Sequence, residues 1–373
     1  MKVVAAIDSF KGSMTSMEAG NAVKKGILAA KPDAEVWLSP LADGGEGTVD
    51  ALIEGLGAEK IPVTVAGPLG EKVSCYYGFL EETKTAVMEM ASAAGITLVI
   101  KKDPLRASTY GVGEMIADAL KRGCKNFMIG IGGSATNDGG IGMLKALGFE
   151  FFDEDGNDVG EGAAALAKIE VIRTENKNSL LSGAKFQIAC DVKNPLCGKQ
   201  GATYIFGPQK GVTEEQKSKV DEAMKHYADV TKESLGCDFA DCEGAGAAGG
   251  LGYAFLSYLA GELIPGVELI LQATGLEEKM KNADVVVTGE GRLDAQTVMG
   301  KAPVGVAALA KKYNAKVIAF AGSVAPEAKV CNRAGIDAFF PIVRGVTTLE
   351  EAMKKENAME NIAATAEQVF RLL

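Results

Sequence analysis

The chain has 373 residues, a length that predicts about two domains, each able to bury a hydrophobic core without disulfides or structural metal. Its formal net charge of −10 argues against a nucleic-acid partner, because such proteins usually carry a basic face. The seven cysteines form no C-x-x-C pair and no apolar run of about 18 residues occurs, so we expect reduced thiols, no membrane partner and a cytoplasmic protein.

Two βα units open the chain. Residues 3–7 form an apolar run typical of a buried strand, and after the loop 8–13 the residues Thr15 and Glu18 have the spacing of a capping box at a helix start. Residues 35–38 predict a second strand, followed by the glycine-rich loop 42–47 and a helix over 48–56. Consecutive βα units favour a parallel sheet whose ligand loops follow the strands.

The pattern changes near residue 61, where short runs at 73–79 and 85–90 are separated by Pro-Gly turns and look antiparallel. A second sheet or domain is expected to start here. Further strands are predicted at 126–129, 185–190, 284–287, 316–320 and 338–342, and helices at about 213–234, 251–263, 303–312 and 348–372. This alternation predicts an α/β protein.

The most informative segment is the glycine run 130–140, which lies between the strand 126–129 and a helical segment that starts at Ile141. Glycines let backbone N–H groups approach a ligand, and a helix N-terminus adds about half a positive charge, so the run suits a phosphate or a carboxylate. Glycine and aspartate are also ordinary turn and cap residues. Their recurrence after successive strands favours an anion site.

Five loops after predicted strands combine a carboxylate with glycine or a cation: residues 8–11, 43–46, 132–140, 191–195 and 289–294. Phosphoryl transfer needs this mixture, because cations and Mg²⁺ neutralise the phosphate oxygens and a carboxylate can take the proton of the substrate hydroxyl. These loops therefore favour a kinase. Positive charge is available from Lys11, Lys193, Lys210, Arg292 and Lys301. The lone histidine, His226, lies in a charged helical pattern, which excludes Ser-His-Asp catalysis and a His/Cys zinc cluster.

The G-x-G-x-x-G match at 244–249 follows no good strand, so packing at the start of helix 251–263 explains it at least as well as a nucleotide does. No G-x-x-x-x-G-K-[ST] sequence is present. The kinase interpretation therefore does not rest on a familiar nucleotide motif.

Seven motifs, taken in order and spacing, resemble the type I bacterial glycerate kinases from about residue 1 to the C-terminus. They are DSFKGS at 8–13, ADGGEGT at 42–48, GGSATNDGG at 132–140, CDVKNPL at 190–196, FGPQKG at 206–211, GAGAAGG at 244–250 and TGEGRLD at 288–294. The resemblance implies ATP- and Mg²⁺-dependent phosphorylation of D-glycerate, with 2-phosphoglycerate as the product.

The resemblance also implies a two-domain α/β architecture with the active site in the interdomain cleft. A Rossmann-like parallel-sheet domain is formed by both chain ends (1–60 and 270–373), and an α/β domain with a mixed sheet (61–269) is inserted. Strand 126–130 fits either sheet. The expected partners are glycerate and ATP, and the expected state is a monomer or homodimer.

Roles within the site are hypotheses. Asp191 or Asp294 accepts the glycerate hydroxyl proton, while Arg292 and Lys11 hold the glycerate carboxylate and the transferring phosphate. The predicted ATP-phosphate contacts are Gly132, Gly133, Ser134, Thr136, Gly139 and Lys301, and the predicted Mg²⁺ ligands are Asp43, Glu46 and Glu290. Two alternatives remain open: a kinase for another small hydroxy acid, and a non-catalytic regulatory protein that binds a small anion.

Overall fold

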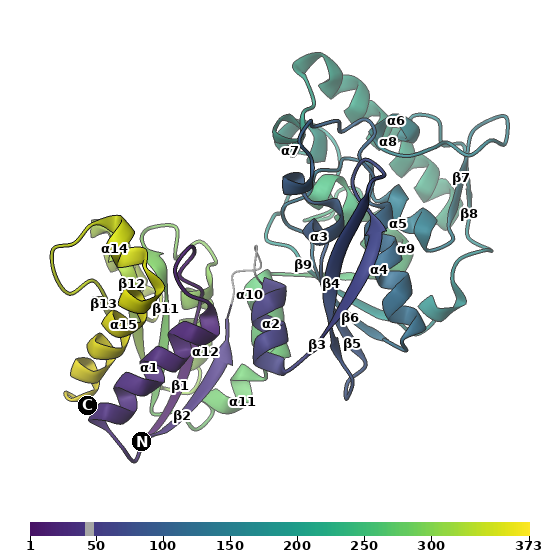
Figure 1. Ribbon diagram of the computed structural model, residues 1–373. Helices are drawn as coiled ribbons and strands as arrows, with labels where there is room; N and C mark the ends of the chain where they lie inside the picture. The colour runs from purple at the N-terminus through teal and green to yellow at the C-terminus, as the bar shows by residue number, and fades with distance from the viewer. Residues whose placement is uncertain (42–47) are drawn as a thin grey trace. The chain divides into compact units, whose positions relative to one another are not determined.

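The computed structural model describes residues 1–41 and 48–373, which form two compact units (Figure 1). The first unit contains residues 1–41, 50–57 and 267–373, so both chain ends lie in it. The second unit contains residues 48, 49 and 58–266. The predicted loop 42–47 lies outside the described residues.

The sheet of the first unit is parallel throughout, with the strand order β13-β12-β11-β1-β2. Its strands are β1 (Lys2–Ile7), β2 (Glu35–Pro40), β11 (Val285–Leu293), β12 (Lys316–Val324) and β13 (Ala338–Pro341). Numbered in chain order within this sheet, the strands run 2-1-3-4-5, the order of flavodoxin-like doubly wound folds. The strand order reverses between β1 and β11, and in such sheets ligands bind outside the carboxyl ends of the strands at that point.

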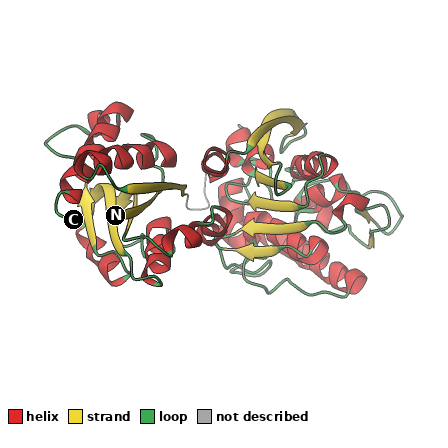
Figure 2. Cartoon of the chain, turned by 90° about the horizontal axis from the view of Figure 1, so that it is seen from below, coloured by secondary structure: helices red, strands yellow, loops and turns green. Residues whose placement is uncertain are grey.

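Helices cover both faces of this sheet (Figure 2). They are α1 (Ser16–Ala30), α2 (Thr48–Leu56), α10 (Gly266–Ala273), α11 (Leu276–Met280), α12 (Ala302–Lys311), α13 (Val330–Arg333), α14 (Leu349–Met353) and α15 (Lys355–Phe370). The predicted capping box of Thr15 and Glu18 starts α1. A Cβ on Gly26 of α1 would lie 2.0 Å from the Ala363 carbonyl oxygen of α15, so glycine lets these two helices pack closely.

The sheet of the second unit is mixed, with the order β10-β9-β6-β5-β4-β3. The strands are β3 (Glu59–Ala66), β4 (Lys72–Leu80), β5 (Thr85–Glu89), β6 (Asn126–Gly130), β9 (Lys185–Ala189) and β10 (Glu262–Ile264). As predicted from the runs after residue 61, β3, β4 and β5 are antiparallel. Strand β6 pairs in parallel with β5 and β9, and therefore belongs to this sheet.

The remaining elements of the second unit surround this sheet and its aromatic-rich core. Its helices are α3 (Ala91–Ala94), α4 (Tyr110–Lys121), α5 (Ile141–Ala146), α6 (Ala163–Leu166), α7 (Ala202–Lys210), α8 (Glu214–Leu235) and α9 (Leu251–Leu259), and β7 (Glu150–Phe152) pairs with β8 (Val171–Arg173). The predicted α/β fold class is confirmed. Within residues 1–41 and 48–373, no helix is both long and apolar enough to span a membrane.

Three sequence-based boundaries change. Strand β11 continues to Leu293, so Glu290 and Arg292 lie in a paired strand and not in the predicted loop. The predicted helix 348–372 is divided at Lys354, whose ψ of 129° is not helical. The predicted helix 251–263 ends at Leu259, and β10 follows.

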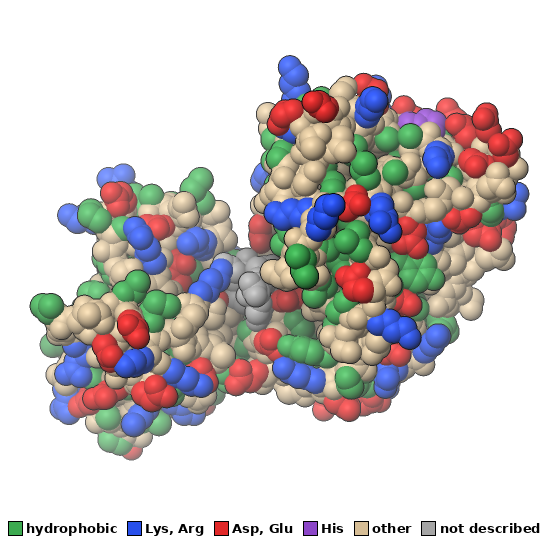
Figure 3. All heavy atoms as spheres, turned by 45° about the horizontal axis from the view of Figure 1, so that its top comes forward, with side chains coloured by type: hydrophobic (Ala, Val, Ile, Leu, Met, Phe, Trp, Pro, Cys, Tyr) green, Lys and Arg blue, Asp and Glu red, His purple; other side chains and the backbone are tan. Residues whose placement is uncertain are grey.

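Basic and acidic side chains are interspersed on the face of the molecule shown in Figure 3.

Candidate active site

A cavity of about 520 Å³ lies at the carboxyl ends of β1, β11, β12 and β13 in the first unit. Its polar lining includes Asp8, Lys11, Glu290, Arg292 and Lys301. These residues come from the segments after β1, within β11 and before α12, so the point where the strand order reverses brings them together. Four of the five are predicted from the sequence as site residues, and Asp8 is not.

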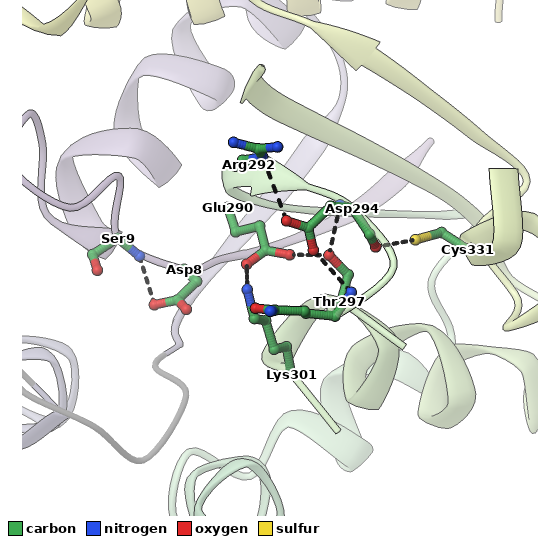
Figure 4. A network of polar contacts seen from close by, with 9 residues as sticks. Asp8, Ser9, Glu290, Arg292, Asp294, Thr297, Lys301 and Cys331 are labelled. Atoms are coloured by element: carbon green, nitrogen blue, oxygen red, sulfur yellow. Dashed lines mark hydrogen bonds and ion pairs between the residues drawn. The ribbon is translucent and has the colours of Figure 1, made fainter. Parts of the chain in front are cut away.

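Glu290 is held by two side-chain contacts at this cavity (Figure 4). The Thr297 hydroxyl donates to its Oε1 at 2.7 Å, and the Lys301 Nζ lies 3.5 Å from its Oε2. Burial raises the pKa of Glu290, and the Thr297 hydroxyl and the Lys301 ammonium partly oppose that rise. The carboxylate therefore fixes the Lys301 ammonium beside the cavity.

Arg292 and Asp294 form an ion pair beside this network, with Arg292 Nε 3.4 Å from Asp294 Oδ2 (Figure 4). The Arg292 side chain is 67% exposed, so most of its guanidinium donors face solvent. Asp294 Oδ1 accepts the backbone N–H of Gln296 at 2.9 Å, which holds the carboxylate in a turn. Both side chains are positioned, and Arg292 retains donors for an anion.

Asp8 follows β1 and is buried, with only 4% of its surface exposed. Its Oδ1 accepts the Ser9 backbone N–H at 2.7 Å, and its own N–H donates to the Gly289 carbonyl at 2.9 Å. The second bond ties the loop after β1 to β11. In the described part of the chain, Asp8 and Glu290 are the carboxylates that line the cavity.

The cavity also has an apolar wall. It is formed by Ile342, Val343, Leu349, Ala352, Met353 and Ala358. Leu349 is 76% exposed and Met353 is 37% exposed, so both offer apolar surface that a bound ring would cover.

The glycine run 130–140 lies in the second unit between β6 and α5, as predicted. At its helix N-terminus, however, lies the chain's own Asp138 carboxylate. Asp138 accepts the backbone N–H groups of Gly140 and Gly142 and both the N–H and the hydroxyl of Thr109, at 2.8–3.3 Å. Gly140 adopts a φ of +79°, and a Cβ there would lie 2.4 Å from the Ala254 Cβ. This end of the run is therefore built for packing.

The other end of the run remains open to solvent. Gly132 and Gly133 are exposed, Ser134 is 6% exposed, and Thr136 and Gly139 are buried. Two backbone bonds fix the exposed part, from Ala135 N to the Ala94 carbonyl (2.9 Å) and from Ile96 N to the Gly133 carbonyl (2.8 Å).

Lys210, at the end of α7, is buried behind this loop with 2% exposure. Its Nζ donates to Ser134 Oγ at 2.6 Å and to the Thr136 carbonyl at 2.7 Å. Burial lowers the pKa of Lys210 to about 7, although the nearby Asp138 carboxylate opposes the shift. A buried amino group therefore holds the loop from the inside.

The remaining predicted residues are more scattered. Asp191 follows β9, is exposed, and accepts the Gly266 backbone N–H at 2.9 Å through Oδ1. Asp43 and Glu46 lie outside the described residues. Residues 1–41 and 48–373 contain no group of three or more His, Cys, Asp or Glu arranged to hold a metal.

Comparison with known proteins extends over the whole chain. Residues 3–373 match the model of the glycerate kinase family. The chain belongs to the glycerate kinase family. This family member is 45% identical to a glycerate kinase of Bacillus subtilis over 371 residues, which are 99% of this chain and 97% of that protein.

Two further relatives agree with this assignment. The kinase is 45% identical to a glycerate 2-kinase of Escherichia coli over 372 residues, which are 98% of each chain. It also resembles a crystal structure described as glycerate kinase 2 from Salmonella typhimurium LT2, with a TM-score of 0.91 and 43% identity over 99% of this chain and 97% of that one. The family predicted from the motifs is thus confirmed.

The structure divides the predicted site residues into two sets. Lys11, Glu290, Arg292 and Lys301 gather at the cavity of the first unit, whereas the residues of the glycine loop belong to the second unit. The hypothesis that both sets act on one phosphate stays a prediction. Asp8 is not among the predicted site residues, although it directly follows the predicted strand 3–7, and Lys210 is predicted only as a source of positive charge.

Proposed function

We propose that this chain transfers the γ-phosphoryl group of ATP to the 2-hydroxyl of D-glycerate, giving 2-phosphoglycerate and ADP. The observation that carries the proposal is the cavity at the carboxyl ends of β1 and β11, where Lys11, Arg292 and Lys301 meet buried carboxylates. Kinases work mainly by positioning the reactants and by neutralising the charge on the phosphoryl oxygens, and this set of side chains suits both tasks.

Arg292 is assigned to the glycerate carboxylate, because its exposed guanidinium offers a planar pair of donors that fits a carboxylate. Lys11 and Lys301 are assigned to the transferring phosphate. Glycerate has no ring or alkyl chain to place against the apolar wall of the cavity, so we assign that wall, including Leu349 and Met353, to the adenine of ATP.

In the chemical step, the glycerate hydroxyl oxygen forms a bond to the γ-phosphorus while the bond from that phosphorus to the β–γ bridging oxygen breaks. The hydroxyl proton passes to a carboxylate, and ADP leaves with the bond's electron pair. Asp294 and Asp191 are the candidates from the sequence, and Asp8 is added because it lines the cavity. Replacing each by asparagine tests which of them is needed for the transfer.

Bound Mg²⁺ would neutralise phosphate oxygens and orient them for transfer. Carboxylate oxygens are the protein ligands that Mg²⁺ prefers, and it usually needs only one or two of them beside phosphates and waters. Glu290 and Asp8 fit this requirement because both carboxylates line the cavity. Asp43 and Glu46 remain further proposed ligands.

The exposed part of the glycine loop is assigned to ATP phosphates through Gly132, Gly133 and Ser134. Because Thr136 and Gly139 are buried, we assign them to the shape of the loop and not to ligand contact.

The deciding experiment measures ADP release with ATP, Mg²⁺ and D-glycerate, and identifies the product by NMR. We expect turnover with D-glycerate and phosphorylation at the 2-position. Faster turnover with tartronate or another hydroxy acid would indicate a different acceptor, a 3-phosphate would overturn the assigned hydroxyl, and ATP binding without turnover with any acceptor would indicate a regulatory protein.

A further inference from the structure

The buried lysine of the FGPQKG motif has no place in the reaction assigned above. Lys210 ends α7, and Thr203 lies two turns earlier in the same helix. Both contact the glycine run: the Asn137 amide donates to the Thr203 hydroxyl at 3.0 Å, and Lys210 donates to Ser134 Oγ and to the Thr136 carbonyl. One face of α7 therefore holds residues 134–137 in place through these hydrogen bonds.

Burial of a lysine destabilises the folded protein unless other interactions compensate, since desolvation disfavours its charged form. Among residues 1–41 and 48–373, Lys210 forms no ion pair with a carboxylate, and its acceptors are a neutral hydroxyl and a neutral carbonyl. An apolar side chain would fill a core position at a lower desolvation cost. Core packing alone thus does not explain a lysine here.

The direction of the Ser134 hydrogen bond supplies a reason. In its charged form the Lys210 ammonium only donates, so Ser134 Oγ is then the acceptor of the 2.6 Å bond and keeps its own hydrogen for another partner. Within residues 1–41 and 48–373, the hydrogen of the Ser134 hydroxyl has no acceptor. Ser134 adjoins the exposed backbone of Gly132 and Gly133, where we place an ATP phosphate.

We propose that Lys210 is a positioning residue that orients the Ser134 hydroxyl as a hydrogen-bond donor to a phosphate oxygen of ATP. This inference rests on the proposed function, which places ATP phosphates at residues 132–134. Lys210 itself is buried and acts through Ser134 and the Thr136 carbonyl. Loss of its amino group frees Ser134 Oγ to rotate and weakens ATP binding, while glycerate binding, assigned to Arg292, is unaffected.

The test compares steady-state kinetics of Lys210→Met, Lys210→Arg, Ser134→Ala and the double variant Lys210→Met/Ser134→Ala. We expect KM for ATP to rise about tenfold in Lys210→Met and in Ser134→Ala, because one charge-assisted or phosphate hydrogen bond contributes about 1.4 kcal/mol. KM for glycerate should change less than twofold, and Lys210→Arg should recover part of the ATP affinity. The exposed Lys219→Met on α8 is the matched control and should resemble wild type.

The double variant separates this role from plain structural support. If Lys210 acts through Ser134, the double variant is no worse than either single variant, since both remove the same interaction. Effects that multiply, or an unchanged KM for ATP in Ser134→Ala, would overturn the inference even if Lys210→Met fails to fold. A wild-type protein without ATP-dependent turnover would instead refute the proposed function.

Discussion

The cavity of the first unit and the glycine loop of the second both collect charged side chains after parallel strands, but the charges have different partners. In the glycine loop, Asp138 and Lys210 are buried and bonded to the chain's own backbone and hydroxyl groups. At the cavity, Arg292 and Lys301 pair with carboxylates yet keep 67% and 32% of their side chains exposed. Charged side chains in similar loops can therefore be fully bonded within the protein in one place and remain partly open to solvent in another.

This difference has a measurable form. Substitutions at the cavity should change kinetics and leave the free energy of unfolding nearly unchanged. Substitutions at Asp138 should do the opposite. The predictions below either separate the two regions in this way or show that the distinction fails.

The largest effect is expected for the proton acceptor. Asp8→Asn, Asp191→Asn and Asp294→Asn each keep the side-chain size, and we expect the variant that removes the base to lose about 10²–10⁴-fold in kcat. Urea unfolding should show that the affected protein is folded. The exposed Asp33→Asn in the first unit is the matched control, and wild-type kcat in all three variants would rule out the carboxylates named here.

Asp138→Asn should lose stability by about 2–3 kcal/mol, because an amide NH₂ then faces N–H donors that the carboxylate accepts. The measurement is the midpoint of urea unfolding, compared with the exposed Asp155→Asn of the same unit. If Asp138→Asn keeps wild-type stability but raises KM for ATP, the loop's carboxylate contributes to binding and the comparison of the two regions is wrong.

Arg292→Met should raise KM for glycerate by about 10–100-fold, since a charge-assisted bond to the carboxylate contributes about 1.5–3 kcal/mol. KM for ATP and the unfolding midpoint should change little, because the side chain is mostly exposed. Arg333→Met, an exposed arginine of the same unit, serves as the control. An equal rise of the KM values for glycerate and ATP would indicate that Arg292 contacts the transferring phosphate and not the glycerate carboxylate.

The lowered pKa of Lys210 should make the free energy of unfolding depend on pH. Its pKa is lowered to about 7 in the folded protein from about 10.5 in the unfolded chain, so between these values the unfolded chain binds the extra proton. Wild-type stability relative to Lys210→Met should therefore rise from pH 7 to pH 9, by up to about 1.4 kcal/mol per pH unit. A flat difference would show that the amino group is not held in an apolar environment.

The smallest effect is expected at the apolar wall. Leu349→Ser removes an exposed leucine that is assigned to the adenine, and we expect KM for ATP to rise about fivefold, which corresponds to about 1 kcal/mol of lost apolar contact. GTP should lose as much as ATP if the contact is purely apolar. Leu372→Ser, at the exposed C-terminal end, is the control, and an unchanged KM for ATP would place the adenine elsewhere.

Local patterns made much of the fold predictable. The apolar run 3–7, the capping box at Thr15 and the antiparallel strands after residue 61 depend on neighbouring residues, and the structure contains them all. Strand β11 was predicted too short, because its outer part contains Glu290 and Arg292, which suggest a loop until the pairing with β12 is known.

The candidate site was less predictable because its contacts join distant segments. The Asp138 carboxylate meets Thr109, and the amino group of Lys210 meets Ser134, which is 76 residues away in the sequence. An aspartate just before a helix is a local signal for a cap, whereas the bonds of Asp138 to Thr109 join segments 29 residues apart. Asp8 was passed over for a different reason, since its value as a site residue comes from its position beside β11.

Strand β1 pairs with β11, so that Val3 lies beside Val285, and this pairing orders events during protein synthesis. A ribosome makes β1 first, yet its neighbour β11 emerges only after the entire second unit, at a synthesis rate of about 5–20 residues per second. The second unit is therefore able to fold while β1 still lacks this neighbour. The cavity with Asp8 and Glu290 can form only after β11 has been made, so a nascent chain that stalls before β11 lacks this site.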